Sequence, residues 1–178
     1  MEGDTGAQRE LYHREKRRVH AVLYRLLGSN SHMEDLVQES FFQIFRSLRT
    51  FRGQASLGTW IDRCTVRVGY TYLSSMKLRP VPIGDLEPES RAPSAESTLR
   101  AREATRRFYQ ALDRIEAKQR VAFVLHEIEG RSMQDVATLM EATVVATKVR
   151  VWRARRALEE RARKDPWLSD FLEEGRES

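Results

Sequence analysis

The sequence has very few residues suited to covalent or metal-based stabilisation. Its 178 residues include one cysteine, Cys64, and four histidines that are scattered along the chain. A single cysteine excludes an internal disulfide, and no Cys/His spacing typical of a zinc site occurs. We therefore predict neither a metal site nor a cofactor, and we interpret Cys64 as a small residue of a hydrophobic core.

Long apolar runs are also missing. Charged residues make up 32% of the chain, and no segment approaches the roughly 20 apolar residues that are needed to cross a bilayer. The first residues are polar and acidic, so no secretory signal is visible. These absences predict a cytoplasmic protein without membrane insertion.

Residues that could perform catalysis together are not grouped in the sequence. The histidines lie at positions 13, 20, 32 and 126, and no glycine-rich phosphate loop is present. Catalysis would need a nucleophile, an acid–base pair or a metal set with evident partners. We therefore predict that the protein is not an enzyme and has no catalytic residues.

Basic residues, in contrast, are abundant and unevenly distributed. Residues 1–80 hold 13 basic and 8 acidic side chains, and residues 99–165 hold 16 and 10. The segments 81–98 and 166–178 are both net acidic. Two basic blocks of domain size favour two contacts with a polyanion such as nucleic acid. Arginine-rich helices that are simply solvated are the alternative interpretation.

The acidic segment between the blocks has the composition of a linker. It contains four of the five prolines of the chain, at positions 80, 82, 88 and 93. Proline lacks a backbone donor and disfavours helix at the preceding residue. We predict an all-α fold of two small helical domains, 8–79 and 99–164, joined by a flexible linker at 80–98. An acidic tail at 165–178 either packs on a neighbour or stays disordered.

The first block predicts three helices. An apolar stripe at helical spacing ends at Gly28, a plausible cap. Residues 31–34 fit a capping box that would start the second helix, whose stripe includes Val37, Phe41 and Ile44. A third helix is predicted from about residue 59 to residue 76.

The second block predicts four helices, roughly at 99–112, 118–128, 132–140 and 143–163. Ser132 and Thr143 are the expected N-caps of the last two. A turn near Glu141 separates these helices, and the final one is strongly basic, which is typical of a helix-turn-helix. Its first turn would enter a major groove while basic side chains hold phosphates. A surface helix in a small bundle is the alternative.

Short motifs in both blocks resemble the extracytoplasmic-function (ECF) sigma factors of the sigma-70 family, the promoter-recognition subunits of bacterial RNA polymerase. In the first block these are Asp35-Leu36-Val37-Gln38-Glu39 followed by Phe42, then Phe51-Arg52-Gly53 and Thr59-Trp60-Ile61. In the second block they are residues 119–123, 129–130, 132, 136–137 and 150–155. Each motif alone is weak, but together, in order and at family spacing, they cover about residues 8–163.

The resemblance implies a role for each domain. The first would bind core polymerase and the minus-ten element, and the second the minus-thirty-five element. The implied core polymerase contacts are Asp35, Leu36, Gln38, Glu39 and Phe42. The implied minus-ten contacts are Phe51, Arg52, Gln54, Ser56, Arg63, Arg67 and Tyr70. The implied minus-thirty-five contacts are Ser132, Thr143, Val144, Ala146, Thr147, Lys148, Arg150, Arg153 and Arg155.

The same resemblance implies the partners. These are the beta and beta-prime subunits of core RNA polymerase, promoter DNA and an anti-sigma factor. The implied function is promoter recognition, local DNA melting and transcription initiation. A stand-alone helix-turn-helix regulator that binds DNA without polymerase is the alternative, but it does not explain the polar side of the second helix, on which Asp35, Gln38 and Glu39 fall.

The sequence departs from the family at positions that contact DNA. Arg67 stands where many members have Asn, and Glu141 or Ala142 where a turn glycine is usual. The usual Gly-Thr-Val at the start of the last helix is replaced by Val145-Ala146-Thr147. The target sequence therefore does not follow from the resemblance.

Overall fold

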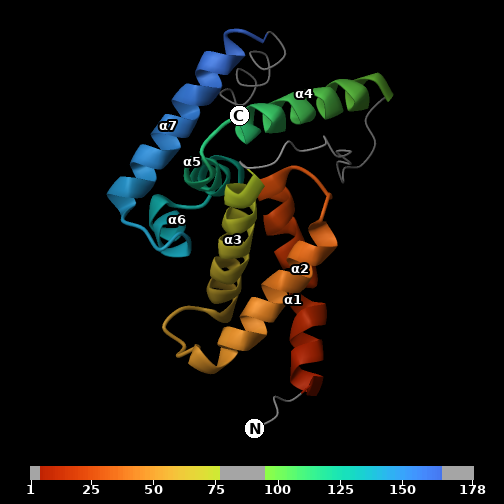
Figure 1. Ribbon diagram of the computed structural model, residues 1–178, viewed down its shortest axis with the longest axis vertical. Helices are drawn as coiled ribbons and strands as arrows, with labels where there is room; N and C mark the ends of the chain where they lie inside the picture. The colour runs from red at the N-terminus through yellow and green to blue at the C-terminus, as the bar shows by residue number, and fades with distance from the viewer. Residues whose placement is uncertain (1–4, 77–94, 166–178) are drawn as a thin grey trace.

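The protein is described by a computed structural model that covers residues 5–76 and 95–165 (Figure 1). Most of the predicted linker and nearly all of the predicted tail lie outside the described residues. Every regular element within the described ranges is helical, which confirms the all-α class. The elements are α1 (Thr5–Leu27), α2 (Met33–Ser47), the 3-10 turn η1 (Leu48–Thr50), α3 (Leu57–Met76), α4 (Ala95–Asp113), α5 (Ala117–Phe123), the π-helical η2 (Val124–Ile128), α6 (Met133–Leu139) and α7 (Val144–Ala162).

The first three helices pack together around the predicted apolar stripes. Val19, Leu23 and Leu26 of α1 are almost fully buried, as are Ile44 of α2 and Ile61 of α3. Their spacing by three, four and seven residues puts the α1 side chains on one face of the helix. The first domain therefore forms from the helices that the sequence predicts.

Gly28 ends α1 as expected, and it has a second role. Its φ is +67°, and its N–H donates to the carbonyl oxygen of Tyr24 at 2.7 Å. A Cβ at this position would lie 2.1 Å from the ring of Tyr109, which belongs to α4. Glycine is therefore needed both for the left-handed turn and for the close approach of the second domain.

The start of α2 differs from the prediction, because the capping box at residues 31–34 does not form. The hydroxyl of Ser31 accepts a hydrogen bond from Ser29 Oγ at 3.0 Å instead of capping the helix. His32 takes the N-cap position with a left-handed φ of 61° and makes no side-chain cap. The capping-box prediction was wrong because α2 begins at Met33, which makes His32 the N-cap residue and leaves Ser31 one position before it.

The second domain contains α4 to α7, with two differences from the predicted elements. Helix α4 begins at Ala95, so the last residues assigned to the linker are helical. The single helix predicted at 118–128 is an α-helix followed by the π-helical η2, where the Glu129 N–H donates to the Val124 carbonyl at 3.0 Å.

Helices α6 and α7 form the predicted helix-turn-helix. The Ser132 hydroxyl accepts the Asp135 N–H at 3.1 Å, and the Thr143 hydroxyl accepts the Ala146 N–H at 3.1 Å. Glu141 adopts the left-handed conformation of the turn, with φ +50°, at the position where glycine is usual. The Ser132 cap thus fixes the start of α6. The Thr143 cap and the left-handed turn at Glu141 fix the start of α7.

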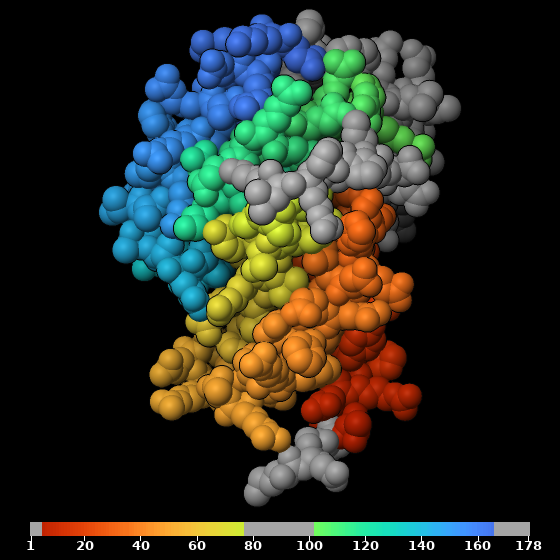
Figure 2. Space-filling view, in the orientation of Figure 1, coloured from red at the N-terminus to blue at the C-terminus, as the bar shows by residue number. Residues whose placement is uncertain are grey.

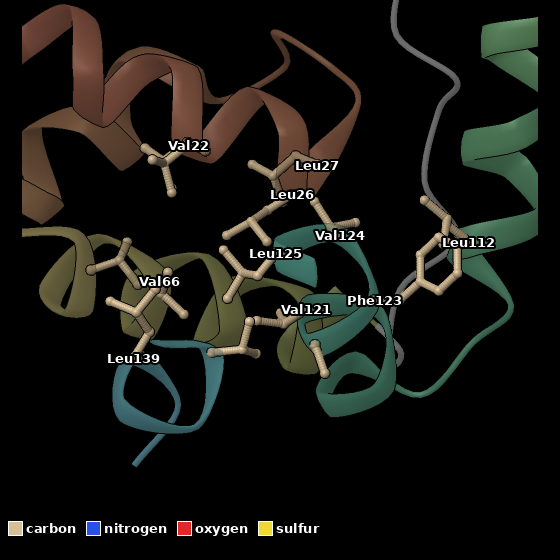
Figure 3. Close-up of a cluster of buried hydrophobic side chains, with 14 of the residues drawn as sticks. Val22, Leu26, Leu27, Val66, Leu112, Val121, Phe123, Val124, Leu125 and Leu139 are labelled. Atoms are coloured by element: carbon tan, nitrogen blue, oxygen red, sulfur yellow. The ribbon is translucent and has the colours of Figure 1, made fainter. Parts of the chain in front are cut away.

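The two domains are packed against each other, which the sequence did not predict. Helix α3 lies against α5 and α6 (Figure 1), and the N-terminal and C-terminal halves are in contact in the space-filling view (Figure 2). One hydrophobic core runs through both domains. Figure 3 shows the side chains that meet there, among them Val22 and Leu26 of α1, Val66 of α3, Val121 of α5 and Leu139 of α6.

Candidate protein and nucleic-acid interfaces

Helix α2 has an inner apolar face and an outer face that carries polar and acidic groups. Its inner residues are buried, whereas Asp35, Gln38, Glu39 and Phe42 are all exposed. We name these four residues the α2 outer face. Phe42 is a large apolar side chain with 59% of its surface exposed. An exposed aromatic beside carboxylates is suited to a protein partner, because carboxylates repel the phosphates of DNA.

Leu36, which was predicted as a polymerase contact, lies on the other side of α2. Its side chain is buried and belongs to the hydrophobic core. Leu36 therefore stabilises the helix that presents the α2 outer face and is not itself part of the exposed surface.

The loop before α3 holds several of the predicted minus-ten residues. Arg52 and Gln54 are exposed. The Ser56 hydroxyl accepts the Thr59 N–H at 3.1 Å, so Ser56 also caps the start of α3. Phe51 is partly buried, with its ring centroid 5.2 Å from that of Trp60. Phe51 thus anchors the loop on the core, and the free polar groups of the loop are those of Arg52 and Gln54.

Helix α3 contributes two further basic groups and Tyr70. Arg67 is exposed, while Arg63 Nε lies 3.9 Å from Glu141 Oε1 in the helix-turn-helix turn. Tyr70 is partly buried against the core. Of these three residues, Arg67 is exposed, while Arg63 and Tyr70 are partly buried.

Cys64, which lies between Arg63 and Arg67 in the sequence of α3, is a small residue packed against the core. It is half-buried, and its Sγ is 4.0 Å from Ser47 Oγ. Burial raises the pKa of the Cys64 thiol, which keeps it in the unreactive protonated form near neutral pH.

The outer surface of α7 differs from the predicted one at its first two turns. Thr147 is fully buried, and its Oγ1 donates to the Thr143 carbonyl at 3.0 Å, so it cannot reach a base. The sequence interpretation of Thr147 as a groove residue was wrong. Val145, Val149 and Trp152 are instead the exposed side chains, with 72%, 41% and 55% of their surface accessible.

A helical wheel would have found these exposed residues. The buried side of α7 is formed by Thr147, Val151, Ala154, Leu158 and Ala162, so positions 145, 149 and 152 fall on the opposite side of the helix. We name Val145, Val149 and Trp152 the α7 outer strip. The sequence prediction assigned the whole first turn, residues 143–147, to the groove, and the contacts that it singled out there were Thr143, Val144, Ala146 and Thr147.

Basic side chains surround the α7 outer strip. Lys148, Arg153 and Arg156 are exposed, and the Arg156 guanidinium lies 5.1 Å from the centre of the Trp152 ring. Arg155 is also exposed and pairs with Glu127 at 2.5 Å. No acidic residue occurs between positions 144 and 158. The surface is therefore positively charged with an apolar centre.

Predicted residues at the edges of this surface have mainly structural roles. Ser132 and Thr143 use their hydroxyls as caps, while Val144, Ala146 and Arg150 are only partly exposed. Capping fixes the α6 and α7 N-termini, where backbone N–H groups are available to an anion.

Arg120 is the main polar contact between the domains. It is 2% exposed, and it donates from Nε to the Leu26 carbonyl and from Nη2 to the Leu27 carbonyl, both at 2.8 Å. These carbonyls end α1 and have no partner within the helix. A hydrogen bond to Asp113 completes its environment. The sequence could not reveal this role, because backbone acceptors in a distant helix leave no residue signature.

Among the residues that the structure places, no group of three or more His, Cys, Asp or Glu side chains could hold a metal ion. None of the described helices is long and apolar enough to cross a membrane.

The fold and these surfaces define a two-domain helical protein with a helix-turn-helix in its second domain. The chain matches the family models "Sigma-70 region 2" over residues 11–78 and "Sigma-70, region 4" over residues 105–158. Together the two matches cover well over half of the sequence. The chain belongs to the sigma-70 family, in its ECF group, and is a sigma factor that directs RNA polymerase in transcription initiation.

Curated relatives and solved structures are similar over nearly the whole chain. The ECF RNA polymerase sigma-E factor of Haemophilus influenzae is 29% identical over 170 residues, which cover 89% of each chain. The sigma-E factor of Escherichia coli K12 is 27% identical, covering 89% of this chain and 88% of its own.

Two solved structures show the same fold. The sigma factor RpoE of Bartonella quintana, in complex with the anti-sigma factor NepR, gives a TM-score of 0.62 at 19% identity, covering 88% of this chain and 97% of that one. CnrH in complex with the cytosolic domain of CnrY gives 0.61 at 21% identity, covering 92% of both.

Proposed function

We propose that the α2 outer face docks on core RNA polymerase while the two domains contact separate promoter elements. The observation that supports this division of labour is the exposure of Asp35, Gln38, Glu39 and Phe42 on one side of α2 in a protein whose other exposed helices are rich in arginine. Acidic and apolar groups suit basic and apolar groups of a protein partner. The beta-prime subunit is the proposed partner for this face.

The DNA contacts are proposed as follows. Arg52, Gln54, Arg63 and Arg67 would contact the opened minus-ten element, where a basic track and polar groups are needed to hold a single strand. Helix α7 would enter the major groove of the minus-thirty-five element, with its basic side chains on phosphates. For these contacts the protein supplies binding groups only, so we propose no catalytic activity and no cofactor. A protein that acts on the bacterial chromosome works in the cytoplasm.

The proposed domain division is 8–79 and 99–164, with a tail at 165–178. The linker between the domains ends before residue 98, because α4 begins at Ala95. We also propose that an anti-sigma factor binds this chain, since the similar chain RpoE is in complex with the anti-sigma factor NepR. A stand-alone helix-turn-helix regulator is not favoured, because it would not need the region 2 domain.

The test is a pull-down of the full chain with core polymerase. The double variant Gln38→Ala/Glu39→Ala removes two exposed groups of the α2 outer face and touches none of the core. It should bind core polymerase at least tenfold more weakly, with an unchanged circular dichroism spectrum. Glu10→Ala, which removes an exposed carboxylate from α1, is the matched control and should bind like the wild type. A folded double variant with wild-type affinity would overturn the assignment of α2.

A further inference from the structure

The α7 outer strip is an apolar surface where a DNA-binding helix usually has polar groups. Val145 and Val149 are one turn apart and Trp152 follows on the same side. The strip lies opposite the buried residues Val151 and Ala154, so the fold of the domain does not use it. In Figure 1, α7 is at the margin of the molecule, away from the first domain.

The charge around the strip indicates what covers it. Lys148, Arg153 and Arg156 are exposed beside it, and the segment 144–158 has no acidic residue. An apolar strip whose charged neighbours on α7 are all cations is complementary to a ligand with an anionic edge and an apolar centre. Duplex DNA has this pattern, because phosphates border the major groove and the 5-methyl group of thymine projects into it.

Valine can read only one feature of the major groove. Its side chain neither donates nor accepts a hydrogen bond, so it cannot pair with the polar atoms of guanine, adenine or cytosine. The thymine methyl group is the apolar contact that the groove offers. Since Val145 and Val149 are in the first two turns of α7, they are in the part of a recognition helix that reaches base edges.

We propose that Val145 and Val149 read thymine methyl groups in the minus-thirty-five element, with Trp152 extending the contact toward the groove edge. This inference rests on the proposed role of α7 in promoter binding and adds the base chemistry to it. Each valine would thus distinguish thymine from the other bases by a single methyl group. The flanking arginines and Lys148 hold the phosphates on either side.

The experiment uses holoenzyme reconstituted from the full chain and core polymerase. Promoter duplexes randomised over the upstream element are selected for binding, and the enriched element is then resynthesised with deoxyuridine in place of one thymine at a time. Deoxyuridine keeps all hydrogen-bonding groups and removes only the methyl. We expect about three- to fivefold weaker binding at one or two positions, the effect of one buried methyl group.

Variants assign the effect to the strip. The deoxyuridine penalty is the ratio of the dissociation constants measured with deoxyuridine and with thymine at one position. In Val145→Ala or Val149→Ala, this ratio should fall to about one at the corresponding position, as a double-mutant cycle requires for contacting groups. Alanine has a higher helix propensity than valine, so α7 should remain folded. Ile128→Ala removes a comparably exposed apolar side chain from η2 and should keep the full penalty.

The outcomes separate the inference from the proposed function. Specific selection with no deoxyuridine penalty at any position would overturn methyl reading and leave the sigma-factor role intact. A penalty that persists unchanged in both valine variants would overturn the assignment to these residues. Failure of the holoenzyme to select any upstream element would overturn the role of α7 and the inference together.

Discussion

Arg131, just before α6, donates from Nη2 to Oδ2 of Asp62 on α3 at 2.8 Å and so joins the second domain to the first. Arg18 of α1 donates to the same carboxylate, from Nε to Oδ1 at 2.8 Å. Asp62 is 1% exposed, and its hydrogen bond raises the pKa of Arg18. One buried carboxylate thus holds cations from two domains.

Removing this carboxylate should weaken both the fold and the docking of the domains. In Asp62→Asn the guanidinium groups of Arg18 and Arg131 lose the buried carboxylate that they share, and the nearest remaining counter-charge is Glu129, 2.7 Å from Arg131. We therefore expect a loss of about 2–3 kcal/mol in the free energy of unfolding. This loss in the free energy of unfolding is smaller than the loss expected for a fully buried ion pair, because both arginines are partly exposed. Urea unfolding measures it. Asp35→Asn, on exposed α2, should change stability by less than about 0.5 kcal/mol.

After limited proteolysis cuts the linker, the two domains should remain bound to each other. Cleavage of the free protein is expected first within residues 80–98, where the prolines and acidic residues predict a linker. Because of Arg120 and the shared core, the two fragments should still co-elute in size-exclusion chromatography. In Arg120→Ala they should separate, while Lys118→Ala, an exposed neighbour, should behave like the wild type. First cleavage within 30–75, or wild-type fragments that elute apart, would contradict the prediction.

Tyr109 should report docking through its ionisation at high pH. Burial raises the pKa of Tyr109 to about 12, and its hydroxyl donates to the Arg25 carbonyl at 2.9 Å. A raised pKa means that the stabilisation is fully present below about pH 10 and is lost as the pH rises through 12. The difference in absorbance at 295 nm between wild type and Tyr109→Phe should show one phenol that titrates near 12. Titration of this phenol near 10 would show that it is not buried by the docking.

Cys64 should react slowly with thiol reagents. Since burial raises its pKa, little thiolate is present at pH 8, and we expect a rate at least tenfold below that of free cysteine with Ellman's reagent. Addition of urea should restore the full rate. A rate equal to that of free cysteine in the native protein would contradict the core placement.

The arginines of α7 should contribute to promoter affinity through charge. Arg153→Ala is expected to weaken binding of holoenzyme to promoter DNA and to reduce the salt slope by about one, because one phosphate contact releases about one counterion. Lys118→Ala, outside α7, is the control. Equal affinity and an unchanged slope in Arg153→Ala would remove this residue from the DNA interface.

Local features of this protein could be predicted from the sequence, while contacts between distant segments could not. The caps at Ser132 and Thr143 and the two faces of α2 depend on spacing within one helix, and the structure confirms them. Thr147 was misplaced because the whole first turn of α7 was assigned to the groove, whereas the helical period puts position 147 on the buried side with Val151 and Ala154. Asp62 gave no signal, since a buried carboxylate and an exposed one look the same in a sequence.

The packing of α3 on the helix-turn-helix also imposes a free-energy cost on promoter binding. Arg63 of α3 lies 3.9 Å from Glu141 in the turn before α7, whereas promoter elements about 25 base pairs apart are separated by roughly 85 Å along B-form DNA, at about 3.4 Å per pair. A chain that makes the proposed contacts at both elements has to pull its domains apart. The fraction of molecules in the open state then scales the apparent affinity for a promoter. Every residue that strengthens the docking, Arg120 foremost, is therefore expected to lower the apparent affinity for a promoter.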